Sequence, residues 1–142
     1  MRSIASIAAL ALVPLCGCSS PATLSDGTAY PRELRQASTL DIQVFRRGRD
    51  LELTNTTARS FGPCTVWLNG RYSKRLDGIA VGETLRLELS GFRDEFGEPF
   101  KAGGFFAAEI PDIVILCQIE EAPEGSGRVL WGLRVAGPLV DE

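Results

Sequence analysis

The stretch of sequence that decides the fold runs from Cys64 to Asp77 and reads C-T-V-W-L-N-G-R-Y-S-K-R-L-D. Its centre is the dipeptide Asn69-Gly70, which suits a tight type I′ hairpin turn because both residues tolerate the positive φ angles that this turn requires. Before the turn, Cys64 and every second residue after it are apolar and share one face of a strand. The stretch therefore predicts a β-hairpin at the centre of a small all-β domain.

The same period of two continues along the rest of the chain from residue 40. One of these runs, Ile113–Ile119, is apolar on both faces, which predicts a fully buried central strand. Seven or eight short strands with almost no helical periodicity predict a single antiparallel β-sandwich of immunoglobulin-like architecture. The further strands are expected at Leu40–Val44, Leu51–Asn55, Thr84–Leu89, Ile113–Ile119 and Val129–Val135.

Residues 1–17 have the layout of a secretory signal. Arg2 supplies a short positive start, and an almost unbroken apolar run follows from Ile4 to Leu15. As a helix this run would be about 18 Å long, which is short of the roughly 30 Å hydrocarbon core of a bilayer. The segment is therefore predicted to be a cleaved signal peptide and not a membrane span.

The run ends in Leu15-Cys16-Gly17-Cys18, which resembles the bacterial lipobox. The resemblance implies that Cys18 becomes the lipid-modified N-terminus, and that Ser19 after it directs the protein to the outer membrane, facing the periplasm. Several acyl chains hold a protein on a bilayer almost permanently, because each buried methylene contributes about 0.8 kcal/mol. The alternative is an ordinary cleaved signal with an incidental cysteine.

Residues 18–39 are expected to form the lipidated cysteine and a flexible tether, with the folded domain at 40–142. Ser, Pro and Gly residues keep the first part of this tether irregular. A flexible coil of this length spans roughly 25 Å between its ends. We therefore expect the domain to sit close to the membrane surface.

Composition restricts the class of function. The formal net charge is −3, with 15 basic and 18 acidic residues, and this balance gives no basic footprint for nucleic acid. The chain contains no His, which removes the commonest general base and the commonest metal ligand. No catalytic residue, metal site or cofactor is predicted.

Two cysteines, Cys64 and Cys117, remain in the domain, both on predicted inward faces of strands. Because an exported protein meets oxidising conditions, a Cys64–Cys117 disulfide is expected. In the chain-entropy model such a bridge stabilises the fold by about 4 kcal/mol. The alternative is two unbridged buried thiols that pack as small hydrophobic groups.

The loop from Phe92 to Phe106 is the other distinctive stretch, because it combines phenylalanines with acidic residues, Gly and Pro. Its rings either pack beneath the loop or form a recognition surface. We expect Phe92 and Phe100 to be core residues. Phe96, with Glu95 and Glu98, is the candidate partner surface. Asp94, Glu95 and Glu98 lack the ligand spacing of a calcium loop and are expected to form a solvated acidic loop.

A set of short motifs occurs between Leu51 and Cys117. They are Leu53-Thr54-Asn55, Cys64-Thr65-Val66-Trp67-Leu68-Asn69, Arg71-Tyr72, Gly82-Glu83, Phe92 with Asp94, Gly97 and Phe100, and Ile115-Leu116-Cys117. With these motifs the chain resembles a family of small uncharacterised bacterial envelope lipoproteins. The resemblance implies no activity, ligand or cofactor.

Two functions from different classes follow. The first is a membrane-anchored, non-enzymatic lipoprotein whose β-sandwich binds an envelope protein or a glycan, or has a structural role. The second is an envelope enzyme that acts on glycan with Asp94 and Glu98 as an acid/base pair. The first is preferred, because the sequence contains no other catalytic grouping.

Overall fold

A computed structural model describes residues 27–137 of the chain. The predicted signal peptide and Cys18 lie outside the described residues. The described part contains seven strands and one short 3-10 helix, η1, and no α-helix. The elements are β1 (Gln36–Arg47), β2 (Asp50–Thr54), β3 (Cys64–Leu68), β4 (Tyr72–Leu76), β5 (Thr84–Glu88), η1 (Leu89–Gly91), β6 (Cys117–Glu121) and β7 (Val129–Val135).

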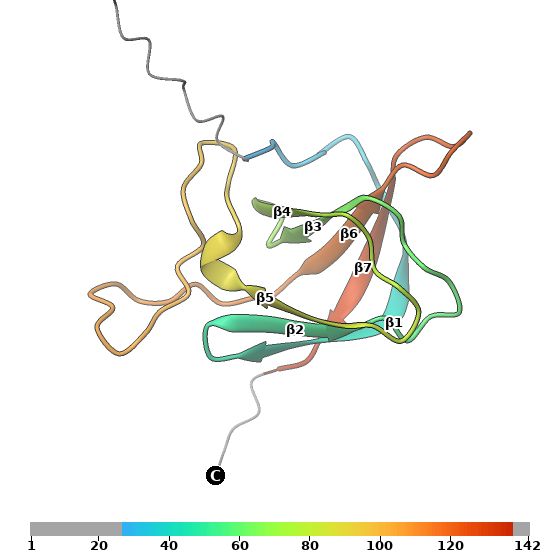
Figure 1. The fold of residues 1–142 in the computed structure, drawn as a ribbon. Coiled ribbons are helices and arrows are strands. Elements are labelled where there is room, and N and C mark those ends of the chain that lie inside the picture. The colour runs from blue at the N-terminus through green and yellow to red at the C-terminus, as the bar shows by residue number, and fades with distance from the viewer. Residues whose placement is uncertain (1–26, 138–142) are drawn as a thin grey trace, which may run out of the picture.

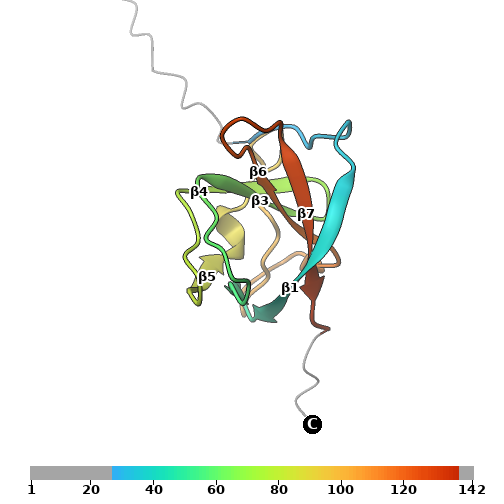
Figure 2. The same ribbon diagram turned by 90° about the vertical axis from the view of Figure 1, so that its right-hand side faces the viewer.

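The seven strands form one mixed sheet in the order β4-β3-β6-β7-β1-β2-β5. All neighbouring strands are antiparallel except β1 and β7, which are parallel. The sheet curls around its core into a half-barrel (Figures 1 and 2). The predicted all-β class is therefore confirmed, but the strands form one curled sheet and not the expected pair of stacked antiparallel sheets.

The long strand β1 explains this difference. It pairs with β7 from Gln36 to Val44 and with β2 from Val44 to Arg47, so it joins the two halves of the sheet. Its pairing with β7 contains two register shifts, one between Gln36 and Ser38 and one between Thr39 and Gln43. Such irregularities bend a strand and increase its twist, which curls the sheet instead of splitting it into two layers.

The hairpin of β3 and β4 is as predicted. Leu68 pairs with Tyr72 across the turn, and Asn69 and Gly70 have φ angles of 54° and 61°. Both angles lie in the left-handed region that a type I′ turn requires.

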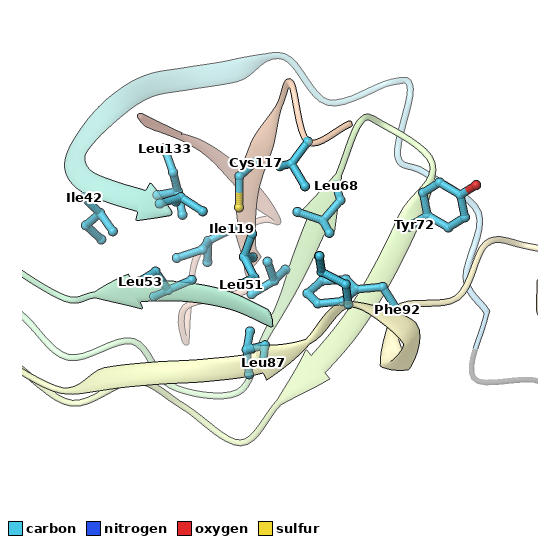
Figure 3. Packing of buried hydrophobic residues seen from close by; sticks show 14 of the residues in the cluster. Ile42, Leu51, Leu53, Leu68, Tyr72, Leu87, Phe92, Cys117, Ile119 and Leu133 are labelled. Atoms are coloured by element: carbon cyan, nitrogen blue, oxygen red, sulfur yellow. The ribbon is translucent and has the colours of Figure 1, made fainter. Parts of the chain in front are cut away.

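The core lies on the concave side of the sheet and includes side chains from all seven strands (Figure 3). The alternation on β2 shows how the sequence builds it, because Leu51 and Leu53 are fully buried while Glu52 between them is only partly so. Burying each such aliphatic side chain contributes about 1.5–3 kcal/mol relative to leaving it in water. Phe92 and Phe100 complete the core from the loop after η1.

The predicted buried strand at Ile113–Ile119 is wrong in its first half. Only Cys117–Glu121 is a strand, and Ile113 and Ile115 are 71% and 76% exposed. The reason is that β3, the neighbour of β6, ends at Leu68, which already pairs with Cys117. Without a neighbouring strand, the backbone before Cys117 bonds to the side chain of Asn69 instead.

The outer face of β3 and β6 is covered by the segment that precedes β1. Tyr30 packs edge-on against Trp67 with ring centroids 5.3 Å apart, and its hydroxyl donates to Gln118 on β6 at 2.8 Å. Trp67 is therefore fully buried although it does not belong to the concave core. Strand β1 also begins at Gln36, so residues 36–39 of the predicted tether belong to the sheet.

Candidate functional site

The predicted Cys64–Cys117 disulfide is wrong, because both cysteines are free. Cys64 lies opposite Glu121, and Cys117 lies opposite Leu68, so the two cysteines occupy opposite ends of the β3–β6 pair. At a rise of about 3.4 Å per residue they are separated by roughly 13 Å along the strands. A disulfide requires Cα atoms within about 7 Å of each other.

Both thiols are buried and are held in the protonated form. Burial raises the pKa of Cys117 to about 12. Burial, with a smaller contribution from the negative charge of Glu121, raises the pKa of Cys64 to about 11. Since the thiolate is the reactive species, these cysteines act as small hydrophobic groups of the core.

The phenylalanines of the loop after η1 divide as expected. Phe92 and Phe100 are buried in the core, whereas Phe96 is 79% exposed. The backbone N–H of Phe100 donates to the carbonyl of Phe92, and Arg93 bridges to Ser73 on β4. These backbone bonds turn the two outer rings inward and leave Phe96 at the tip.

Asp94 is the residue that shapes this tip. Its Oδ1 accepts the backbone N–H groups of Phe96 at 3.0 Å and Glu98 at 2.8 Å. Its Oδ2 accepts the Nη2 and Nε groups of Arg71 at 2.7 and 3.1 Å. The carboxylate is buried, and each of its oxygens accepts two hydrogen bonds, so it fixes the loop to the β3–β4 hairpin.

The same geometry bears on the Asp94–Glu98 acid/base pair. The hydrogen bond from Arg71 lowers the pKa of Asp94, whereas a general acid at neutral pH needs a raised pKa. The exposed Glu98 carboxylate also approaches Arg71, at 3.4 Å. Both carboxylates therefore share one guanidinium. Within residues 27–137, no group of three or more His, Cys, Asp or Glu side chains is arranged to hold a metal ion.

Sequence reasoning missed a charged cluster around the buried Glu121, at the far end of β6. Glu121 accepts two hydrogen bonds from Arg59, at 3.1 and 2.7 Å, and a third from the indole of Trp131 at 2.7 Å. Burial acts to raise the pKa of Glu121, but the bonds from Arg59 and Trp131 outweigh it and lower the pKa. Arg59 also lies over the rings of Phe61 and Trp131. The cluster locks the β2–β3 connection onto β6 and β7, and no local sequence signal marks it.

The most unusual surface lies on residues 101–116, here called the apolar loop. Phe105 and Phe106 are 96% and 94% exposed, and their rings pack edge to face at 5.0 Å. The sequence placed these two rings in a loop, but it predicted that Ile113 and Ile115 would be buried in a strand. The other exposed apolar side chains of this loop are Ile110, Ile113 and Ile115.

The base of the apolar loop is firmly held although its tip is exposed. The guanidinium of Arg46 on β1 donates to the carbonyl of Ala102 at 2.7 Å and to that of Asp112. The Asp112 carboxylate accepts the hydroxyl of Tyr72 at 3.1 Å and the backbone N–H of Lys101 at 3.1 Å. The loop is therefore held out from the domain on a fixed base.

The candidate partner residues of the other loop lie around a shallow hollow. Glu95 and Phe96 line it together with Tyr30, Arg32 and Arg71. Glu98 lies outside the hollow's lining and reaches the site only through Arg71.

Comparison with protein-family models, curated proteins and solved structures finds no match to this chain. Among residues 27–137, no helix is long and apolar enough to cross a membrane.

Proposed function

We propose that the chain is a bacterial envelope lipoprotein, held to a membrane by lipid on Cys18, whose β domain is a non-enzymatic binding or structural module. The observation that carries the binding role is the set of large apolar side chains held in water on two neighbouring loops. They are Phe96, Phe105, Phe106, Ile110, Ile113 and Ile115.

Exposed apolar side chains are common singly, but a cluster of them marks a contact surface. Here Phe105 and Phe106 contact each other, and all six side chains stand on loops whose bases are fixed by Asp94, Arg46 and Asn69. A preordered surface loses little conformational entropy when it binds. The loops are therefore better suited to recognition than to filling a core.

The non-enzymatic role is supported by the state of the carboxylates. Asp94 is ionised, buried and bonded to four donors, so it has no free position for a substrate proton. The lipid anchor is supported by Leu15-Cys16-Gly17-Cys18, and the outer membrane, facing the periplasm, is proposed from the resemblance of this segment to sorted lipoproteins.

The anchor is tested by feeding bacteria that express the full chain a fatty acid with a clickable tag. The wild-type chain should carry the tag and sediment with membranes. The Cys18→Ala variant should lose the tag and move to the soluble fraction. The matched control is Cys16→Ala, which removes a neighbouring thiol and should keep the tag. A tagged Cys18→Ala chain would overturn the anchor.

A further inference from the structure

We propose that the exposed apolar loops dip into the surface of the lipid bilayer, so that the domain lies against the membrane on this face and does not hang freely from its tether. The membrane-contacting face consists of the tip around Phe96 and the apolar loop, residues 101–116. This inference rests on the proposed lipid anchor and adds a second, independent contact with the same membrane.

The two loops belong to one end of the half-barrel. Asn69 in the β3–β4 turn donates to the carbonyl of Ile113 at 2.7 Å and accepts the N–H of Ile115 at 2.9 Å. Arg71, two residues after Asn69, donates to the carboxylate of Asp94 in the loop that carries Phe96. Figure 1 shows both loops projecting on the side of the molecule where η1 lies. The two loops therefore share a base at the β3–β4 turn and project on the same side of the domain.

The chain enters the described structure beside this face. Gly27 lies so close to the Asp94–Gly97 turn that a Cβ atom there would collide with the Asp94 carbonyl. Gly27 lies nine positions after Cys18 (27 − 18 = 9), and nine residue steps span at most about 30 Å. A lipid on Cys18 would therefore hold the Phe96 loop within that distance of the bilayer.

Both acidic side chains of the apolar loop have partners within the domain. Glu109 forms an ion pair with Lys101 at 2.8 Å. Asp112 accepts hydrogen bonds from the Tyr72 hydroxyl and the Lys101 backbone N–H. No other acidic residue occurs between positions 101 and 116. Because one carboxylate is paired with a cation and the other is hydrogen-bonded, the cost of bringing this loop to a bilayer interface is reduced.

Arginines stand at the base of the loop. Arg46 holds two of its carbonyls, and a Cβ on Gly104 would lie 3.8 Å from the Arg49 side chain. Arg49 is exposed, and its ion pair with Glu88 is long, at 3.7 Å. Apolar side chains that enter the interface, flanked by cations that reach anionic headgroups, are typical of peripheral membrane contacts.

The shape of the surface favours a bilayer over a protein partner. Phe105 and Phe106 are almost completely exposed, and neither lines any of the hollows described for residues 27–137. Hot-spot aromatics of protein interfaces are surrounded by a rim that excludes water. A protruding pair of rings without such a rim needs no matching pocket and can insert into a soft apolar layer.

The test uses the lipidated full chain, purified in detergent and reconstituted into vesicles of phosphatidylethanolamine and phosphatidylglycerol. An environment-sensitive fluorophore is attached to Phe106→Cys, or to Ile110→Cys in case the first variant fails to fold. Cys64 and Cys117 are buried and protonated, so they should not take the label in the folded chain. The control is Glu124→Cys, in the β6–β7 turn at the opposite end of β6.

In vesicles the emission of the fluorophore at position 106 or 110 should shift to the blue and be quenched by brominated lipid. Its quenching by iodide should fall severalfold, while the fluorophore at position 124 stays accessible to iodide. Equal iodide access at all three positions would overturn the proposal. Protection that appears in native envelope vesicles but not in pure lipid would also overturn it and would indicate a protein partner. The fatty-acid tag on Cys18 is measured in a separate experiment. If the tag is absent, vesicles are added to the soluble chain, and the fluorophore still reports whether the loops contact the bilayer.

Discussion

The loop Phe92–Phe100 and the apolar loop that follows it both contain two or more phenylalanines, but the first loop buries two of its rings and the second exposes both of its rings. In the first loop Phe92 and Phe100 fill the core, whereas in the second Phe105 and Phe106 stand in water. The difference lies in the backbone. Backbone bonds tie the first loop to β4 through Arg93, whereas the second loop is bonded to the domain at its base and its tip has only a turn bond of its own, from Ala107 to Gly104. Whether a ring is buried is thus decided by the backbone partners of its loop and not by the ring itself.

The largest expected effect comes from truncating an inward ring. Phe92→Ala should lower the free energy of unfolding by about 3–5 kcal/mol, because it removes a fully buried ring and leaves a cavity. Thermal denaturation would show this as a fall in melting temperature of many degrees. Phe96→Ala, in the same loop, is the matched control and should melt close to the wild type. Equal losses in both variants would remove the distinction between the rings.

The second effect concerns the ion pair between the buried Asp94 and the half-exposed Arg71, which shapes the first loop. Because the pKa of Asp94 is lowered in the folded state by Arg71, the pair stabilises the fold above the unfolded pKa of about 4. That stabilisation is lost as the pH falls through the folded pKa. Arg71→Leu should therefore be destabilised at neutral pH, and the gap to the wild type should narrow below about pH 4.

Melting curves between neutral and acidic pH measure this gap. Glu98→Gln is the control, because its exposed carboxylate lies farther from Arg71 than Asp94 does, and its profile should follow the wild type. A gap between Arg71→Leu and the wild type that is the same at every pH would show that Arg71 acts through packing alone.

A smaller effect is expected where the apolar loop is fastened to the β3–β4 turn. Asn69→Gly preserves the positive φ of the turn but removes the side chain that bonds Ile113, Ile115 and Leu116. The loss should be about 1 kcal/mol, typical of exposed or half-buried hydrogen bonds. Amide hydrogen exchange should accelerate at Ile115 and remain unchanged at Val66 in the neighbouring strand. Unchanged exchange at Ile115 would contradict the role given to Asn69.

No change at all is expected from reductant. Cys64 and Cys117 are free and far apart in the sheet, so the melting temperature should be the same with and without dithiothreitol. Thiol titration of the unreduced protein should give two reactive groups, from Cys64 and Cys117, only after denaturation. A melting temperature that depends on reductant would show that the disulfide forms after all.

The strands and the central turn could be predicted from the sequence because both depend on local patterns. Alternating residues identified β2 and β7, and Asn69-Gly70 identified the hairpin. The predictions that failed depend on which strands become neighbours in the sheet. The disulfide required a register in which Cys64 faces Cys117, and the register places Cys64 opposite Glu121 instead.

The same reason accounts for the exposed isoleucines and for the curled sheet. Ile113 and Ile115 match the pattern of a strand, but β3 ends before it can pair with them. The curl arises from register shifts in β1 that only its pairing with β7 reveals. For the candidate site, the sequence separated Phe96 from Phe92 and Phe100 correctly. It left the role of Phe105 and Phe106 open, and it assigned Ile113 and Ile115 to a buried strand although both are exposed.

The most direct measurement for the central claim is the melting temperature of the Phe105→Ser/Phe106→Ser double variant. Both rings are exposed, so the variant should melt at the wild-type temperature, since surface substitutions usually change stability by less than about 0.5 kcal/mol. A loss as large as that of Phe92→Ala would show that these rings are part of the core, and the contact surface would no longer exist.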